Sequence, residues 1–468
     1  MRSPLQSARL RRILAAYTAN RLGTWFGVVA LMVAVYDHTH SALAVAGLLL
    51  AWQALPAFVV PAVVARVEAS SRRYELSGLY FFEALATAAL AVLLWHFWLP
   101  LVLLIAALDG TAALTASALL RAALARAARE QVAADEALNG HTPAGDAAGG
   151  RPGEDDRDER AHEAERAANA ASNVAFATTF VIGPAIAGAI VAAAGAPAAL
   201  FIDVGSFLAC GALLLDLHPH VEEAGGESVR ARLRAAVAHL SEVPTLRWLL
   251  AVEAFALVFF ESGAPIEITY AKVTLHSGDR GFGLLLTAWG AGAVLGSLVF
   301  ARMARRSLAA MLSAGTLAVG LGYVGFAAAP SLALACVAAL VGGVGNGIEL
   351  PSLNSLIQRL TPQRLHGRMM GGVESLGALS LALGVPLGGA LVAVSSPRVA
   401  FLAIGLGTAL TAAALARTLY GTGGLTAASE PQAAQDREQQ AAHAQVAPQA
   451  PGPSGVPNAA TQREPASK

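Results

Sequence analysis

Long apolar runs, each followed by a short polar stretch, dominate the chain. A helix needs about 20 mostly apolar residues to cross the hydrocarbon core of a bilayer. Such runs lie at 13–36, 43–65, 75–97, 99–120, 173–194 and 197–217 in the first half and at 248–270, 282–301, 309–329, 331–353, 371–394 and 399–420 in the second. They are continuously apolar rather than alternating, which favours helices over barrel strands. The sequence therefore predicts an all-α membrane protein with twelve transmembrane helices in two six-helix bundles.

The polar stretches divide the chain into segments. We predict an N-terminal bundle at 1–217, a cytoplasmic linker at 218–246, a C-terminal bundle at 247–420 and a disordered cytoplasmic tail at 421–468. Within the first bundle, a hydrophilic cytoplasmic insertion at about 139–168 is rich in Gly, Asp, Glu and Arg, so it buries too little apolar surface to order itself. Apolar residues recur on one face of 229–246, which predicts an amphipathic helix on the membrane surface. The first apolar run is too long for a signal peptide, so we expect a retained helix.

The placement of Lys and Arg sets the expected orientation. With the N-terminus inside, only Lys272, Arg280 and Arg398 fall in outside loops, whereas every inside connection carries several basic residues. Cytoplasmic loops of membrane proteins carry such an excess. We therefore expect a multi-pass protein of the bacterial cytoplasmic membrane with both termini in the cytoplasm.

The two halves also share a sequence repeat. Residues 47–66 and 283–302 align without a gap and have eight identities in twenty. Each segment is the second predicted helix of its half. Internal repeats of this kind are typical of transporters built from duplicated halves.

Composition narrows the function classes. The chain is 55% apolar and 14% charged, which is far from the soluble balance. Its net charge of zero arises because acids in one hydrophilic stretch cancel arginines spread among many short loops, so it says nothing about partners. For a membrane protein of this class we expect no nucleic-acid partner. It contains no Walker A sequence and no His/Cys cluster with metal-ligand spacing, and its GxGxxG match at 320–325 lies inside an apolar helix. We expect no enzyme activity, no cofactor and no metal.

Ionisable and amide side chains inside the predicted helices require an explanation. An unpaired charge at the bilayer centre costs about 2.5–3.5 kcal/mol on insertion scales. The candidates for proton coupling or a substrate cavity are Asp109 in the fourth helix, Glu253 and Glu261 in the seventh, Asn346 and Glu349 in the tenth, and Asn20 and Arg21 in the first. Asp109 is either a proton acceptor, a substrate counter-ion, or a buried acid held by a neighbouring helix. Glu83 and Glu374 lie near the inner surface, where we expect them to reach water.

Four motifs resemble those of exporters in the major facilitator superfamily. TPQRLHGRMMG at 361–371 resembles the loop between the tenth and eleventh helices, and RVEASSRR at 66–73 and RMARR at 302–306 resemble the gating loops. GPAIAG at 183–188 is similar to the antiporter signature. The likeness is greatest to the drug, macrolide and siderophore branch.

The resemblance implies roles for particular residues. The resemblance implies a gating role for Arg66, Arg72, Arg73, Arg302, Arg305 and Arg306. It also implies that a helix bends at the interface of the two halves, at Gly183, Pro184 and Gly188. The family's cavity is lined by the first, fourth, seventh and tenth helices, which carry the candidates above, whereas Asp203 in the sixth belongs to the outer packing. Ala65 and Ala301 stand where the gating loops usually have Asp, and Ala187 stands where a second Gly is usual. The plainer alternatives are an inner-loop charge bias for the arginines and close helix packing for the glycines.

These observations together predict a secondary transporter. We expect proton-coupled efflux of a drug-like, macrolide-like or siderophore-like small molecule by alternating access. The expected partners are that substrate, the proton and the lipid bilayer, and the expected functional unit is a monomer. A transporter-like receptor or assembly protein is one alternative, favoured by Ala65 and Ala301. An uptake carrier is the other.

Overall fold

The computed structural model describes residues 7–60, 63, 75–138, 152–215, 240–303, 306–362 and 365–421. These residues form helices, turns and bends, without a strand. Twelve helices in this part of the chain are long and apolar enough to cross a membrane. The predicted all-α class and its twelve spans are thereby confirmed. Residues 218–239 of the predicted linker and 422–468 of the predicted tail lie outside the described residues, and the last three residues of the predicted linker, 244–246, already belong to helix α9.

The N-terminal half contains helices α1 to α7. Their bounds are α1 Ala8–Thr39, α2 Ala42–Leu49, α4 Glu75–Leu93, α5 Leu99–Leu138, α6 Pro152–Ala194 and α7 Ala196–Leu213. Helix α2 continues directly into a π-helical turn, η2, at Leu50–Ala54. A short 3-10 turn, η3, at Leu94–His96 ends α4. The π-turn matters for the site, because it rotates the side chains that follow it.

The C-terminal half contains helices α9 to α14. Their bounds are α9 Pro244–Thr269, α10 Gly278–Arg302, α11 Leu308–Ala328, α12 Leu332–Leu360, α13 His366–Val394 and α14 Pro397–Gly421. A second π-helical turn, η4, at Tyr270–Thr274 follows α9. Short turns join neighbouring helices at one end of both halves, which we call the short-turn end. The long connections lie at the opposite, long-loop end.

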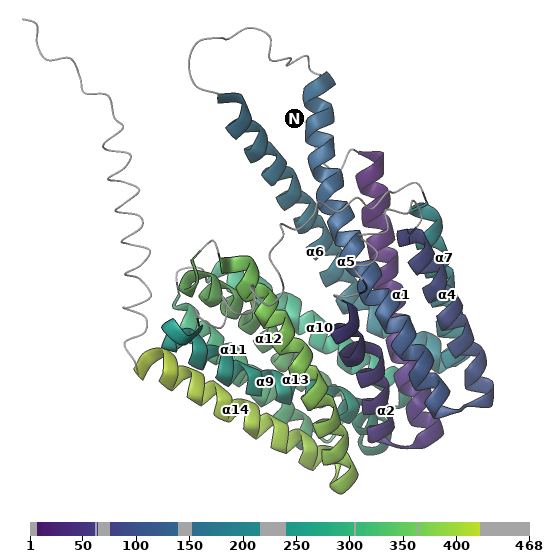
Figure 1. Ribbon diagram of the computed structural model, residues 1–468. Helices are drawn as coiled ribbons and strands as arrows, with labels where there is room; N and C mark the ends of the chain where they lie inside the picture. Colours follow the sequence, from purple (N-terminus) through teal and green to yellow (C-terminus); the bar gives the residue numbers. More distant parts are fainter. Residues whose placement is uncertain are drawn as a thin grey trace, which may run out of the picture. The chain divides into compact units, whose positions relative to one another are not determined.

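Helices α5 and α6 are longer than the membrane requires. They have 40 and 43 residues, so at 1.5 Å per residue each is about 60–65 Å long, roughly twice the hydrocarbon thickness. Both project past their neighbours at the long-loop end (Figure 1). Residues 152–166 are part of α6, so the expectation that this part of the insertion is unstructured is wrong. Ala164 and Ala168 of α6 are buried against the N-terminal half, and this packing stabilises the extension.

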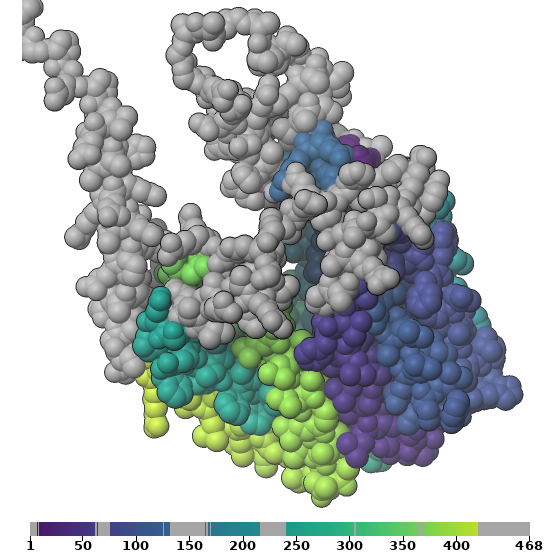
Figure 2. Space-filling model, viewed as in Figure 1, coloured from purple at the N-terminus to yellow at the C-terminus, as the bar shows by residue number. Residues whose placement is uncertain are grey.

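The hydrophobic core differs between the two ends. At the short-turn end one continuous cluster joins both halves, from Val35 of α1 to Phe282 of α10 and Phe401 of α14. At the long-loop end each half has its own cluster, one around Leu120 and one around Leu356. The halves also meet through α6 against α10 and α2 against α13. Figure 2 shows the α13 atoms (green) directly against those of α2 (purple).

Glycines bring α10 and α12 into backbone contact. Gly292 and Gly296 of α10 face the Leu340 and Val344 carbonyls, and Gly343 and Gly347 of α12 face the Trp289 and Ala293 carbonyls. A methyl group at any of the four positions would overlap the opposite backbone. Small residues four apart allow this close approach in membranes.

Candidate functional site

A pocket in the N-terminal half lies among α1, η2, α5 and α6. It has a volume of about 320 Å³. Its wall combines the rings of Trp25, Trp52, Phe176 and Phe180 with the polar side chains of Asn20, Arg21, Gln53 and Ser117. The Arg21 guanidinium lies 4.9 Å from the centre of the Phe176 ring, a cation–π contact. The structure thus places the predicted residues Asn20 and Arg21 in one cavity.

Asp109 lies directly behind this pocket rather than in its wall. Its carboxylate accepts a hydrogen bond from Trp52 Nε1 at 3.1 Å and another from Thr87 Oγ1 at 3.4 Å. Trp52 itself lines the pocket, as does Gly110, the residue after Asp109. The acid is buried. One indole ring therefore separates a buried carboxylate from a cavity of small-molecule size.

The π-turn η2 explains why Trp52 and Gln53 both line the pocket. A regular helix would direct adjacent residues about 100° apart, whereas π-turns widen the helix locally and occur often at functional sites. Gly110 permits the approach, because a Cβ there would overlap the Trp52 carbonyl. Sequence reasoning did not identify Trp52 or Gln53.

A second polar site lies in the C-terminal half. Glu253 of α9 and Glu349 of α12 line a small cavity of about 20 Å³ together with Asn346. Thr316 Oγ1 donates a hydrogen bond of 2.9 Å to Glu349 Oε1. Glu253 Oε2 is buried and finds no hydrogen-bond partner among the described residues. Two ionised carboxylates that line one small buried cavity would repel each other, which favours a proton on one of the pair.

The remaining predicted acids lie apart from both cavities. Glu261 of α9 is half-buried against Gly384 of α13 and is not brought together with Glu253. Asp203 of α7 is buried, accepts a hydrogen bond from Ser206 and packs against Gly23 of α1, a structural arrangement.

The expectation that Glu83 reaches water is wrong. The side chain of Glu83 is fully buried within the N-terminal half. Glu83 is on the face of α4 that packs inside the N-terminal half, so its carboxyl group is in the interior and not near the surface. Glu374 is exposed, as we expected.

The Gly-Pro motif of α6 lies at the contact with α10. The Pro184 carbonyl would be 2.7 Å from a Cβ on Gly283, and a Cβ on Gly188 would be 2.9 Å from Gly283 Cα. Proline at 184 removes the hydrogen bond to the Phe180 carbonyl, four residues earlier, and that carbonyl faces Gly290 of α10. Gly183 instead packs against the Trp25 ring. The predicted position of Pro184 at the interface of the halves agrees with these contacts.

The gating arginines are only partly described. Arg302 ends α10 and Arg306 follows it, and both are exposed. Arg66, Arg72, Arg73 and Arg305 lie outside the described residues. The gating role of all six stays a prediction.

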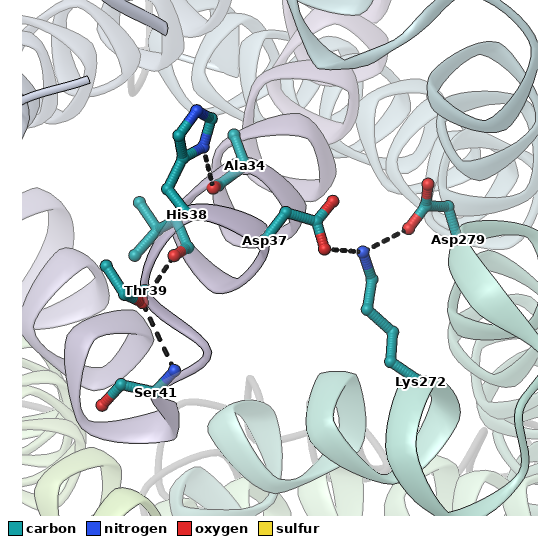
Figure 3. Close-up of polar contacts among 8 residues, drawn as sticks. Ala34, Asp37, His38, Thr39, Ser41, Lys272 and Asp279 are labelled. Carbon is teal, nitrogen blue, oxygen red and sulfur yellow. Dashed lines mark hydrogen bonds and ion pairs between the residues drawn. The ribbon is translucent and has the colours of Figure 1, made fainter. Parts of the chain in front are cut away.

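An ion-pair cluster joins the halves at the short-turn end. The ammonium group of Lys272 in η4 contacts the Asp37 carboxylate at the end of α1 and lies 2.7 Å from Asp279 Oδ1 at the start of α10. Figure 3 shows the ammonium group between these two carboxylates. We call this cluster the latch. Only the contact with Asp37 crosses between halves. Lys272 is one of the three basic residues expected in outside loops, and the sequence does not predict its partners.

The comparisons with known proteins agree with this architecture. A model of the Major Facilitator Superfamily matches residues 254–451. The multidrug efflux pump Tap of Mycolicibacterium fortuitum is 28% identical over 249 residues, which are 51% of this chain and 60% of that protein. Tap of Mycobacterium tuberculosis (strain ATCC 25618 / H37Rv) is 29% identical over 51% of this chain and 58% of that protein. The match thus spans about three-fifths of the length of these curated relatives.

Solved structures share the fold over most of the chain. The nucleoside transporter NupG matches with a TM-score of 0.65 and 12% identity, covering 88% of this chain and 100% of that one. A bacterial homologue of the human lysosomal transporter Spinster, inward-facing and occupied, matches with a TM-score of 0.61 and 14% identity over 89% and 97%.

The fold and the site define a multi-pass α-helical membrane protein with six spans in each half and a polar cavity in each. Over residues 254–451 the chain is similar to the Major Facilitator Superfamily. Its helical fold is shared with solved transporters.

Proposed function

We propose that the chain is a secondary exporter that moves a small molecule by alternating access in exchange for a proton. The N-terminal pocket, at about 320 Å³, falls within the size range of small-molecule sites. Aromatic rings with one guanidinium and two amides suit a flat, apolar substrate that carries hydrogen-bond acceptors. The relatives' name, multidrug efflux pump, supports export as the direction.

The observation that carries this proposal is the shared position of Trp52. Its ring forms part of the pocket wall, and its N–H donates a hydrogen bond to the Asp109 carboxylate. A substrate that moves the Trp52 ring changes the hydrogen bonds that the Asp109 carboxylate accepts. When a carboxylate oxygen of Asp109 loses the hydrogen bond from the indole, it binds a proton in its place. Substrate and proton thereby alter each other's binding reciprocally, as coupled sites must.

The packing of the halves supports one of two alternating states. The continuous core, the α6–α10 contact and the latch hold the short-turn end closed, whereas the long-loop end has separate cores. We assign the long-loop end to the cytoplasm of a bacterial cell because the basic connections lie there. The functional unit that we propose is a monomer.

Transport assays with the full chain in everted vesicles test the proposal. We expect that at least one of a lipophilic cation (tetraphenylphosphonium), a macrolide and a siderophore collapses a preformed pH gradient. Asp109→Asn should abolish this substrate-dependent proton flux while the protein still inserts. Glu374→Gln, which changes an exposed acid, should leave it intact. Full flux in Asp109→Asn would remove that residue from the coupling.

The same vesicles separate the alternatives. An uptake carrier would move labelled substrate in the opposite direction under the same gradient. A receptor or assembly protein would bind a ligand without moving it. Trp52→Phe keeps the ring and removes the donor, so we expect substrate movement with fewer protons per substrate. An unchanged proton-to-substrate ratio in Trp52→Phe would show that the indole does not couple the two sites.

A further inference from the structure

One face of α4 carries a row of buried polar side chains. Ser77, Tyr80, Glu83 and Thr87 follow one another at intervals of three, three and four residues, so they lie on the same side of the helix. All four are buried. The row begins two residues after the start of α4 at the long-loop end and runs toward the middle of the membrane.

Three consecutive members of this row lack hydrogen-bond partners. Ser77 Oγ, Tyr80 Oη and Glu83 Oε1 find none among the described residues. Buried polar groups in native proteins are nearly always hydrogen-bonded, and bound water is a usual partner for those that have none within the protein. Bound water serves groups of this kind, provided that several polar partners converge. The Tyr80 ring packs 6.5 Å from the Phe207 ring of α7, which places the row inside the N-terminal bundle.

The row ends at Asp109. Thr87, its last member, donates the 3.4 Å hydrogen bond to Asp109 Oδ1. Glu83 lies one helical turn before Thr87 on the same side of α4, so it faces the same way as the hydroxyl that bonds to Asp109. From Ser77 to Thr87 is ten residues, or about 15 Å along the helix axis, which is half of the hydrocarbon thickness of about 30 Å. The row thus spans the distance from the long-loop surface to the mid-membrane acid.

Neither a metal ion nor the pocket accounts for this row. Among the described residues no three His, Cys, Asp or Glu side chains are arranged to hold a metal ion. None of the four side chains of the row lines the N-terminal pocket. What the row offers is a chain of hydroxyl and carboxyl groups, which is the chemistry that carries protons.

We propose that this face of α4 is a proton path between Asp109 and the long-loop end, separate from the substrate pocket. A proton leaves the Asp109 carboxyl group through the Thr87 hydroxyl or a bound water, and an O–H bond forms on Glu83. Glu83 then passes its proton to water at Tyr80 and Ser77. The path rests on the proposed proton coupling. Substrate and proton would reach the long-loop side by different routes.

The first test detects water directly. Hydroxyl-radical footprinting modifies tyrosines that touch ordered water, and Tyr270 is a matched control, because it is equally buried but its Oη donates a 2.7 Å hydrogen bond to the Phe326 carbonyl. We expect Tyr80 in the full chain to be modified at least about tenfold faster than Tyr270, because only Tyr80 has an unsatisfied hydroxyl. Equal, slow modification of both tyrosines would overturn the proposal. This readout does not depend on transport.

The second test separates proton movement from substrate binding. Glu83→Gln should slow proton-driven transport at least about tenfold, as expected for loss of a proton carrier, while substrate exchange without a pH gradient stays unchanged. Thr115→Val, a near-isosteric change at a buried position whose hydroxyl bonds within its own helix, should affect neither. Tyr80→Phe and Ser77→Ala keep Glu83 and should each slow only the proton-driven rate, so they test the path if Glu83→Gln fails to fold.

The outcomes distinguish this path from the proposed function. Full proton-driven rates in Glu83→Gln, or in both other variants, would overturn the path while leaving proton coupling intact. No substrate-dependent proton flux in the unmodified protein would instead overturn the coupling itself.

Discussion

The latch allows a quantitative prediction for the balance between the two states. In Asp37→Asn the negative charge that pairs with Lys272 is lost, whereas the ion pair of Lys272 with Asp279 remains in the C-terminal half. The side chain of Asp37 is 48% exposed and that of Lys272 14% exposed. A half-exposed ion pair contributes about 0.2–1 kcal/mol. Asp279 already holds Lys272 in place, which reduces the side-chain entropy lost in the pair, so we expect the upper end of that range.

A loss of about 1 kcal/mol changes the ratio of open to closed short-turn ends by roughly fivefold. Spin labels at His40 and Val394, both exposed at this end and on different halves, report that ratio as a distance distribution. We expect the longer distance to gain population in Asp37→Asn at low salt. The effect should shrink in 1 M salt, because screening weakens the original pair.

Arg398→Gln provides the matched control. Arg398 lies at the same end, but its guanidinium donates to the Ala327 carbonyl within the C-terminal half at 2.9 Å. Its loss should leave the distance distribution unchanged. An identical distribution in Asp37→Asn and the unmodified protein at low salt would refute the reasoning, and so would an equal shift in Arg398→Gln.

Two further substitutions follow from the packing. Gly283→Val should place methyl groups against the α6 backbone, where even a Cβ would be 2.7 Å from a carbonyl oxygen. The short-turn end should then fail to close, and the transport rate should fall. The control Gly205→Ala has open space around the new methyl group and should transport normally. Glu253→Gln keeps a hydrogen-bond donor near Glu349 and should change the free energy of unfolding by less than about 1 kcal/mol. Glu253→Leu removes the donor and should lower the free energy of unfolding by about 1–3 kcal/mol, measured by thermal melts in detergent. Equal losses of stability in the two variants would contradict the pairing of the two carboxyl groups.

The helices followed from the sequence because each crossing must be apolar over about 20 residues. That requirement applies only to residues inside the bilayer. It therefore predicted the membrane-spanning parts of α5 and α6, at 99–120 and 173–194, but not their extensions beyond the bilayer. Those extensions contain small buried residues such as Ala128 and Ala164. Alanine is common in every segment of this chain, so its burial left no distinct signal.

The site was predicted only in part, for a related reason. The cost of placing charge in lipid pointed to Asp109 and to the pair Glu253 and Glu349. The partners of these acids depend on which helices meet. Trp52 suits any apolar helix, and nothing in its neighbourhood predicts a π-turn. Glu83 was misplaced because depth along a helix does not reveal which face is covered.

The glycine contacts between α10 and α12 have a mechanical consequence. With no room for a methyl group between the two backbones, these helices can neither slide nor rotate against each other without separating. They must travel as one rigid piece when the halves move. The distance between two reporter groups, one on α10 and one on α12, should therefore be the same in every state. It can serve as a reference for distances that change when the halves move.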